Sequence, residues 1–285
     1  MIQIDKSRFQ NILDEEILSI DFLTQGQIGP IYRLKTPGSQ YLLKISSPSE
    51  RLRTEADMLK DIKKYDIAVP SVRSVSSTYL LMDYIEESFV PLKEKERMAA
   101  EILIRLHSVS NESRMYGYWY DTTIGPFRQN NEQTQYNWAL FFGQMRLVPM
   151  AKTCFEKELI SQDQFSRIES LSRGLYRRID MSAITPSLLH GDLWSGNILF
   201  NIKGATLIDP ALYFGDREVD LAFIRMFDTF GDDFFAHYTQ TFPLSEDFYE
   251  VKEPLYQLYF YLLHVALYGR AYLSGVDCSL RRLKV

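Results

Sequence analysis

The first part of the chain contains short runs of apolar residues separated by turn residues, a pattern typical of the strands of a sheet. Pro37-Gly38-Ser39-Gln40 lies between two of these runs and predicts a hairpin. Segments with the apolar spacing of a helix lie before the first three of these runs and between the third and the fourth. The predicted elements are a helix at 6–18, strands at 20–24, 31–36 and 41–45, a helix at 48–65, and strands at 71–75 and 79–84. Together they predict a small lobe dominated by a sheet.

After residue 86 the spacing of apolar residues becomes helical. Within 91–107, for example, Met98, Ile102 and Leu106 fall on one face. Further helices are predicted at 138–155, at 161–179 and over most of 219–272, with an irregular segment at 115–131. The pattern predicts an α+β fold of two lobes, a small antiparallel-sheet lobe over residues 1–86 and a larger, mainly helical lobe over residues 87–285.

The most apolar segment, at 255–268, predicts a buried helix. Pro254 suits the first turn of such a helix, and Gly269 suits its end. Gln257 and His264 interrupt the segment, which is also shorter than the roughly 20 apolar residues that span a bilayer. We therefore expect no association with a membrane.

Composition and charge narrow the class of protein. The chain has 285 residues, of which 46% are hydrophobic and 24% charged, as in an ordinary globular enzyme. A net charge of -5 argues against a broad nucleic-acid-binding face. Cys154 and Cys278 offer neither a disulfide framework nor a metal cluster, and the chain does not start with a signal-peptide pattern. We expect a cytoplasmic monomer that does not bind nucleic acid.

The residues that suggest chemistry are concentrated between Leu189 and Asp209. Asp192 is followed by Asn197, and a predicted hairpin over 198–208 would bring Asn197 close to Asp209. In kinases an aspartate at the first position orients the attacking hydroxyl, while an asparagine and a second aspartate bind the metal ions on the nucleotide phosphates. We expect Asp192 to be the catalytic residue and Asn197 and Asp209 to be metal ligands.

A lysine and a glutamate in the first lobe are predicted to pair. Lys44 lies on the strand at 41–45, and Glu55 falls on the apolar stripe of the helix at 48–65. Because an unpaired buried carboxylate is strongly unfavourable, Glu55 needs a cation. In kinases such a pair places the lysine against the α- and β-phosphates. The alternatives are Glu50 as the partner and a pair with a purely structural role.

Two more segments of the first lobe suggest a nucleotide site. The loop at 25–30 contains Gly26, whose missing Cβ would let backbone N–H groups approach phosphate, although Pro30 removes one donor. Since the loop lacks the G-x-x-x-x-G-K-[ST] pattern, a plain hairpin turn is the alternative. The segment 83–86 is the expected hinge between the lobes.

Some neighbouring residues have a structural interpretation beside a catalytic one. We favour a His190 that braces its loop through hydrogen bonds over a His190 that acts as acid or base. Ser195 lacks the G-x-S-x-G context of a nucleophile. Trp194 would either stack on a sugar or fill the core, and the acidic residues at 216–220 suit the start of a helix.

The chain resembles the fructosamine kinase (ketosamine-3-kinase) family, relatives of the aminoglycoside phosphotransferases with a protein-kinase-like fold. Two motifs carry the resemblance: His190-Gly191-Asp192-Leu193-Trp194-Ser195-Gly196-Asn197, and Asp209-Pro210-Ala211 at the place where protein kinases have Asp-Phe-Gly. Supporting matches are Ile124-Gly125, Gln129 and Asn130, Trp138 to Phe142, Arg146-Leu147, Pro149 and Leu255 to Tyr259. The resemblance extends from about residue 17 to residue 272.

By this resemblance the enzyme transfers the γ-phosphate of ATP, with Mg²⁺, to the O3 hydroxyl of a ketoamine. The amine would be a small glycated amine or a glycated lysine of a protein. The 3-phosphate is unstable and eliminates, which releases the amine, so the activity amounts to deglycation. Ribulosamines and erythrulosamines are the favoured substrates over fructosamines. Residues 1–86 would bind the nucleotide, and residues 87–285 would carry the catalytic and substrate sites.

The resemblance also implies roles for single residues. Asp192 would meet the O3 hydroxyl, and the segment 80–85 would contact adenine with Met82 at the back of the pocket. The nucleotide-binding residues would be Gly26, Lys44, Glu55, Met82, Asp83 and Tyr84, the metal ligands Asn197 and Asp209, and the substrate-binding residues Trp194 and Asp216.

One position departs from the family pattern. Many relatives have Gly-Gly-Cys-Ile in the phosphate loop, where this chain has Gln25-Gly26-Gln27-Ile28. Without a thiol at position 27, the redox-controlled dimers that are linked to this cysteine in some relatives should be absent. With one glycine fewer, phosphate positioning would depend more on Lys44 and magnesium.

Two other functions remain open from the sequence. A phosphotransferase for a different alcohol, such as an aminoglycoside or choline, would need an acidic pocket. The candidates for such a pocket are Glu86, Glu87, Asp216 and Glu218. The other function is that of an inactive pseudokinase that holds a nucleotide or a partner, against which the full set of expected catalytic residues argues.

Overall fold

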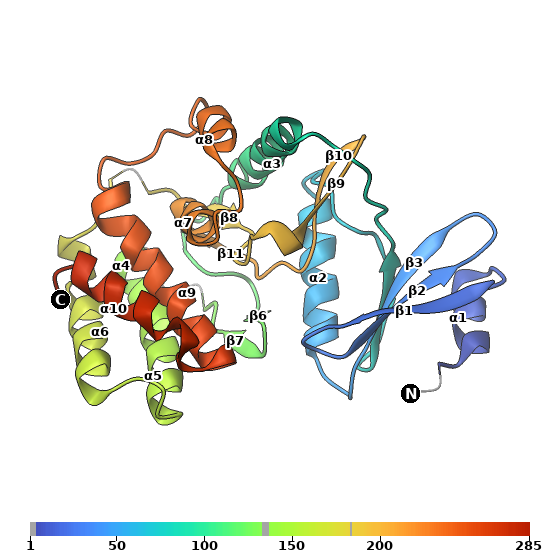
Figure 1. The fold of residues 1–285 in the computed structure, drawn as a ribbon, viewed down its shortest axis with the longest axis horizontal. Helices are drawn as coiled ribbons and strands as arrows, with labels where there is room; N and C mark the ends of the chain where they lie inside the picture. The colour runs from blue at the N-terminus through green and yellow to red at the C-terminus, as the bar shows by residue number, and fades with distance from the viewer. Residues whose placement is uncertain (1–3, 133–136, 183) are drawn as a thin grey trace.

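A five-stranded antiparallel sheet in the order β1-β2-β3-β5-β4 forms the first lobe of the computed structural model (Figure 1). The model describes residues 4–132, 137–182 and 184–285. The strands are β1 (Ser19–Gln25), β2 (Pro30–Lys35), β3 (Gln40–Ile45), β4 (Val72–Val75) and β5 (Tyr79–Asp83), and two helices accompany them, α1 (Lys6–Leu13) and α2 (Arg51–Lys63). The hairpin predicted at 37–40 joins β2 to β3.

The two faces of this sheet have different partners. On one face Leu43 and Leu81 pack with Phe9 of α1 in a small core of their own. On the other face Leu80 and Met82 belong to the large core that also contains α2 and the second lobe. Figure 1 shows α2 between the sheet and the second lobe. The helix is therefore held from both sides, which matters because it carries Glu55.

The second lobe is mainly helical. Its helices are α3 (Leu92–His107), α4 (Trp138–Phe142), α5 (Val148–Glu156), α6 (Gln162–Gly174), α7 (Glu218–Met226), α8 (Asp232–Tyr238), α9 (Glu253–Tyr268) and α10 (Leu273–Arg282), with π-helical turns at Gly143–Leu147 and Phe248–Lys252 and 3-10 turns at Leu175–Arg177, Ser195–Asn197 and Arg270–Tyr272. Three two-stranded pairs lie among them, made by β6 (Thr122–Ile124) with β7 (Phe127–Gln129), β8 (Ser187–Leu189) with β11 (Tyr213–Gly215), and β9 (Ile198–Asn201) with β10 (Gly204–Leu207).

The buried helix predicted at 255–268 is present as α9, with Pro254 in its first turn and Gly269 after its last residue. Gly269 has a φ of 81° and a ψ of -164°, a backbone conformation that is essentially restricted to glycine. Among the described residues, no helix is long and apolar enough to cross a membrane. The α+β fold class with a small antiparallel sheet is confirmed.

Two element predictions are wrong in detail. The first helix was expected to reach residue 18 but ends at Leu13, because Asp14 turns left-handed with a φ of 55° and its N–H bonds to the Gln10 carbonyl. The segment expected to be irregular at 115–131 contains the β6–β7 hairpin. The lobe boundary at residue 86 stays a prediction, and the chain between β5 and α3 is where the two lobes join.

Candidate active site

Lys44 and Glu55 form a buried ion pair at the base of the interlobe cleft. The Lys44 Nζ lies 2.7 Å from the Glu55 Oε1, and both side chains are about nine-tenths buried. Lys44 comes from β3 and Glu55 from the core-facing side of α2, as their positions in the sequence predict. Glu50, the alternative partner, instead lies beside Arg53 at the surface.

The same ammonium also contacts Asp209, so one cation serves two carboxylates. Burial alone would lower the pKa of Lys44, but Asp209 and Glu55 outweigh it and raise the pKa above the ordinary value. Burial raises the pKa of Glu55 to about 7 in spite of Lys44. Burial would also raise the pKa of Asp209, but there the contact with Lys44 outweighs burial and lowers the pKa. Lys44 is therefore a fixed positive charge at neutral pH.

Asp192 and Asn197 are joined by direct hydrogen bonds. The Asn197 Nδ2 donates to the Asp192 carbonyl oxygen at 2.7 Å and to its Oδ2 at 3.2 Å. Because the nitrogen of the Asn197 amide is used in this way, its oxygen is the side that can bind a cation. Burial raises the pKa of Asp192 well above its ordinary value. The 3-10 turn at Ser195–Asn197 brings the two residues together.

His190 braces the loop that carries Asp192, which is the interpretation favoured from the sequence. Its Nε2 lies 3.0 Å from the Ile208 carbonyl oxygen, and its Nδ1 accepts from the Asp192 N–H at 3.3 Å. These contacts define one neutral tautomer, and burial lowers the pKa of the ring. Both ring nitrogens are thus occupied within the protein.

Two backbone conformations in this region are special. Gly191 has a φ of 79°, and a Cβ at this position would lie 2.3 Å from the Ala211 carbonyl oxygen, so only glycine fits. Asp209 also has a positive φ, 51°, which is uncommon outside glycine and is found disproportionately at functional sites. The carboxylate of Asp209 is consequently directed by a constrained backbone.

Asp220 binds the backbone of the loop that carries Asp192, a role that was not predicted from the sequence. Its Oδ2 accepts from the His190 N–H at 2.7 Å and its Oδ1 from the Gly191 N–H at 2.9 Å, while the His107 Nε2 lies 3.2 Å away. Its position in the acidic run at 216–220 predicts only a role at the start of a helix. The signal was available, because Asp220 lies between the apolar residues Val219 and Leu221, where an unpaired carboxylate would be strongly unfavourable.

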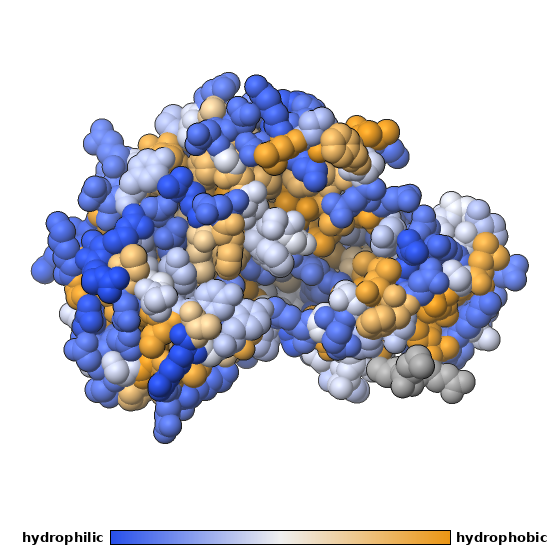
Figure 2. Space-filling view, viewed as in Figure 1, coloured by the Kyte–Doolittle hydropathy of each residue, from blue (hydrophilic) through white to orange (hydrophobic). Residues whose placement is uncertain are grey.

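A cavity of about 370 Å³ lies between the lobes, where Figure 2 shows the surface hollowed. Besides the predicted residues, it is lined by Arg51 and Met58 of α2 and by Ile124 and Gly125 of the β6–β7 hairpin. The predicted site residues that line it are Gly26, Lys44, Glu55, Asp192, Trp194, Asn197 and Asp209.

The predicted adenine-binding residues do not line this cavity. Met82 is buried on the face of β5 that packs in the large core, and the Asp83 carboxylate accepts from the Arg73 Nε at 2.6 Å. The Tyr84 N–H donates to the Gln40 carbonyl oxygen at 3.1 Å, and its ring lies under the Arg33 guanidinium. Contacts of these three residues with a nucleotide stay a prediction.

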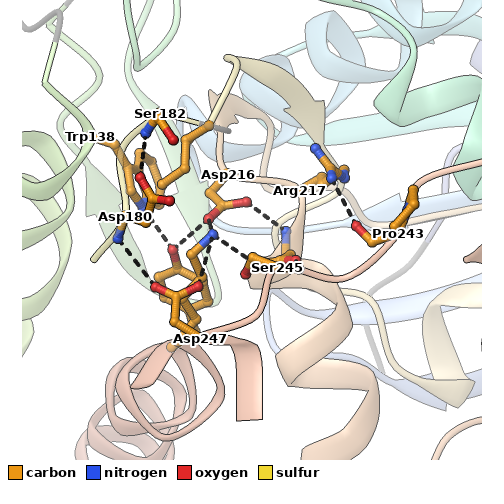
Figure 3. Close-up of polar contacts among 12 residues, drawn as sticks. Trp138, Asp180, Ser182, Asp216, Arg217, Pro243, Ser245 and Asp247 are labelled. Atoms are coloured by element: carbon orange, nitrogen blue, oxygen red, sulfur yellow. Dashed lines mark hydrogen bonds and ion pairs between the residues drawn. The ribbon is translucent and has the colours of Figure 1, made fainter. Parts of the chain in front are cut away.

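Asp216, which was predicted to bind substrate, does not line this cavity either. It is 2% exposed, and its Oδ2 accepts from the Tyr256 hydroxyl at 2.7 Å and from the Lys252 ammonium at 2.9 Å (Figure 3). Its Oδ1 accepts from the Glu218 N–H at 3.1 Å. Both carboxylate oxygens of Asp216 are thus engaged inside the protein, and its contact with substrate stays a prediction.

A second cavity of about 220 Å³ adjoins the first and shares Asp192 and Trp194 with it. Trp194 is 42% exposed, and its ring lies over Gly196, where a Cβ would come within 2.5 Å of the indole. The indole therefore faces the cavities and does not fill the core. The other aromatic residues of this cavity come from α7 and the residue after it, from α9 and from the turn after α9, and they are Phe223, Phe227, His264, Tyr268 and Tyr272.

Comparison with known proteins gives consistent results over the whole chain. A family model described as fructosamine kinase matches residues 2–284. A protein of Enterococcus faecium named "probable ketoamine kinase" is 32% identical over 262 residues, which cover 88% of this chain and 90% of that protein. A candidate fructosamine-3-kinase from Thermobifida fusca superimposes with a TM-score of 0.88 at 26% identity, over 99% of both chains.

The fold extends to more distant enzymes. An aminoglycoside phosphotransferase solved with ADP and hygromycin B superimposes with a TM-score of 0.67 at 14% identity, over 98% of both chains. At this identity the likeness concerns the fold alone. Together with the fructosamine-3-kinase likeness, it identifies the protein-kinase-like fold expected from the sequence.

Proposed function

Because this chain belongs to the fructosamine kinase family, we propose that it transfers the γ-phosphate of ATP to the O3 hydroxyl of a ketoamine. Ribulosamines and erythrulosamines are the favoured acceptors, and fructosamines are a further class. The observation that carries the proposal is that Lys44, Asn197 and Asp209 line one cavity, and that Asp192 lies where this cavity meets a second one. The residues that line the first cavity are of the kind that bind phosphate and its metal ion, and the second cavity can hold an acceptor.

Lys44 is the residue that would bind the nucleotide phosphates. Its ammonium is buried, permanently charged and fixed by Glu55, so it can hold a phosphate oxygen without first losing much side-chain freedom. Gly26, in the loop above it, leaves the backbone open toward the same cavity. The pair thus provides a preorganised positive site for a triphosphate.

The donor set of the site also fits Mg²⁺. This ion prefers oxygen ligands from one or two protein groups together with phosphate oxygens, and the Asp209 carboxylate and the Asn197 amide oxygen are of that kind. When bound, the ion would neutralise the charge on the β- and γ-phosphates. The chain's own contribution is to direct Asp209, through its left-handed backbone, toward the cavity that Lys44 occupies.

Asp192 would orient the attacking hydroxyl and accept its proton. It lies in the walls of both cavities, so a hydroxyl in the second cavity can meet a phosphate in the first across this carboxylate. Asn197 fixes one carboxylate oxygen, and Asp220 fixes the backbone of the loop. These contacts hold the carboxylate in place, which is the main requirement in phosphoryl transfer.

The composition of the second cavity favours a ketoamine over a polycationic acceptor. Of the described residues that line it, Asp192 is the one carboxylate, and the remainder is largely aromatic. The acidic residues that an aminoglycoside or choline pocket was expected to use do not line it. Asp216 and Glu218 are neutralised by Lys252, and Glu86 and Glu87 lie beside the β9–β10 hairpin.

The product would determine the biological outcome. A ketoamine 3-phosphate can eliminate inorganic phosphate, and with uptake of water it releases the amine and leaves a dicarbonyl fragment. The net result is removal of the sugar from a glycated small amine or a glycated lysine. Phosphorylation thus serves as the committing step of deglycation.

Acceptor profiling tests the proposal. Steady-state kinetics with ribulose-, erythrulose- and fructose-lysine, under ATP and Mg²⁺, should give the highest kcat/KM for one of the first two. Kanamycin and choline serve as the competing acceptors. Turnover of either of these, without turnover of any ketoamine, would overturn the proposal.

A further inference from the structure

The tip of the phosphate loop carries a side chain that reaches across the cleft. The loop between β1 and β2 closes through a hydrogen bond of 2.9 Å from the Gly26 N–H to the Gly29 carbonyl oxygen. Gly29 lies so close to β3 that a Cβ there would be 2.0 Å from the Ile45 carbonyl oxygen. The loop is therefore held down onto the sheet, and Gln27 is placed at its exposed turn.

Gln27 lies where the two cavities meet. The cavities share Gln27, Ile124, Gly125, Asp192 and Trp194. Of the described residues that line the second cavity, Gln27 is the one that comes from the sheet lobe. The loop that covers the phosphate site thus also forms part of the wall of the acceptor site.

Both ends of the Gln27 amide face the helical lobe. The Nε2 lies 3.5 Å from the Tyr268 hydroxyl at the end of α9, which is at the long limit of a hydrogen bond. The Oε1 lies beside Gly125, since a Cβ added to that glycine would approach it to 2.9 Å. Contacts this weak are readily exchanged for better ones with a ligand.

The chemistry of this amide suits the acceptor that the proposed function requires. A primary amide offers two N–H donors and one acceptor oxygen without a charge, so it can bind sugar hydroxyls or the protonated amine of a ketoamine. The other side chains of this cavity that can donate a hydrogen bond are Trp194, His264, Tyr268 and Tyr272, and all of them belong to the helical lobe. Hydroxyl recognition from the sheet side must therefore come from the phosphate loop.

We propose that Gln27 is a specificity-determining residue that hydrogen-bonds the ketoamine acceptor and, with Tyr268, closes the loop over it. The proposal rests on the ketoamine kinase function described above. Gln27 lies where the two cavities meet, and its amide would contact the acceptor, so acceptor binding and loop closure become one event. In this chain the phosphate loop recognises the acceptor as well as covering the phosphates.

Kinetics of three variants test this role. In Gln27→Ala the KM for ribulose-lysine should rise about tenfold, the equivalent of one or two hydrogen bonds, while the KM for ATP changes less than about twofold. Tyr268→Phe removes only the hydroxyl and should give a smaller rise in the KM for ribulose-lysine.

The double variant should have a KM for ribulose-lysine no higher than that of Gln27→Ala alone, because the two residues act through one contact. Gln162→Ala, which truncates an exposed glutamine with a single side-chain bond at the start of α6, is the matched control and should leave both KM values unchanged.

The outcomes separate the two proposals. A wild-type protein that phosphorylates no ketoamine removes the proposed function, and the inference falls with it. A wild-type protein that is active, with a Gln27→Ala variant whose ketoamine KM is unchanged, leaves the function standing and refutes the role of Gln27. An equal rise in the KM for ATP would also refute it, since Gln27 would then act on both sites and would not be specific to the acceptor.

Discussion

The carboxylate of Asp192 is the residue on which turnover should depend most. Asp192→Asn keeps the size of the side chain but removes its charge and its ability to accept a proton. We expect kcat to fall between about a hundredfold and ten-thousandfold, the range for loss of a general base. Nucleotide binding should persist, since Lys44, Asn197 and Asp209 remain. Ketoamine-dependent ADP formation and calorimetry with ATP measure the two effects, and a variant with near-normal kcat would remove Asp192 from this role.

Asp209 should affect a different step. In Asp209→Asn the residue loses the charge that faces Lys44 and the cavity, so the magnesium-dependent part of nucleotide affinity should weaken by more than about tenfold, as changes even to outer partners of a metal site can do. Calorimetry with ATP, in the presence and absence of Mg²⁺, separates this part from the rest. Equal affinities of variant and wild type with Mg²⁺ present would contradict the assignment.

For single residues, the sequence predicted a contact correctly where the chemistry of the side chain required one kind of partner. Glu55 on an apolar stripe required a cation, and Lys44 provides it. Asp220 also lies among apolar residues, but its partners are backbone N–H groups far away in sequence. The partners of Asp216 are Lys252 and Tyr256, which are also far away in sequence and come from the π-helical turn before α9 and from α9 itself. Contacts of this kind depend on tertiary structure and leave no local pattern.

At the scale of elements, the β6–β7 hairpin and its flank hold α2 in position. The Arg51 Nη2 donates to the Gly125 carbonyl oxygen at 2.6 Å. The hydroxyls of Tyr118 and Tyr120 donate to the Asp61 Oδ2 at 3.1 and 2.7 Å. These contacts, from the helical lobe to a helix of the sheet lobe, keep Glu55 facing Lys44.

Removal of both hydroxyls should loosen this helix. We expect Tyr118→Phe combined with Tyr120→Phe to lower the free energy of unfolding by about 1 to 3 kcal/mol. Amide hydrogen exchange in α2 should become faster, because its brace on the second lobe is weakened. Tyr176→Phe, at an exposed tyrosine, is the control. Unchanged exchange in α2 would show that the bonds to Asp61 do not hold the helix.

Long periodic elements were the ones that the sequence predicted well. α2, α3 and α9 lie where their apolar stripes indicate, and the hairpin of β9 and β10 brings Asn197 and Asp209 into one cavity. The β6–β7 hairpin was not predicted, because its strands are three residues each and show no alternation of their own. It is held by tertiary contacts, among them hydrogen bonds from the Thr122 hydroxyl to the Leu212 carbonyl oxygen and from the Gln129 Nε2 to the Tyr259 hydroxyl.

At the scale of the whole molecule, a buried charge cluster beneath the active site supports the helical lobe. Lys252 is 2% exposed and lies 2.9 Å from Asp216 and 2.8 Å from Glu218. The Trp138 Nε1 donates to the Tyr256 hydroxyl, which in turn donates to Asp216 (Figure 3). The cluster connects α4, α7 and α9.

Lys252→Met should therefore destabilise the protein strongly. It leaves two buried carboxylates without a cation, a change that costs about 3 to 5 kcal/mol. Lys60→Met breaks an exposed ion pair with Asp57 and should cost less than about 1 kcal/mol. Chemical denaturation of both variants provides the measurement. A cost for Lys252→Met no greater than that for Lys60→Met would mean that the cluster is not needed for stability.

The arrangement of the two lobes could be anticipated from the change in pattern after residue 86, but the way they meet could not. The large core runs from α2 into the helical lobe without a break, and no periodicity in the sequence specifies which helix bridges the lobes. This continuity places Lys44 of one lobe against Asp209 of the other. The active site is thus a property of the assembled molecule.

Phosphorus NMR of the product tests the central claim most directly. Ribulose-lysine incubated with the protein, ATP and Mg²⁺ should yield a new phosphate ester coupled to the proton on C3, followed by inorganic phosphate and free lysine as it decomposes. With Asp192→Asn the ester should not accumulate. Consumption of ATP without a ketoamine ester, or an ester at a different carbon, would contradict the account.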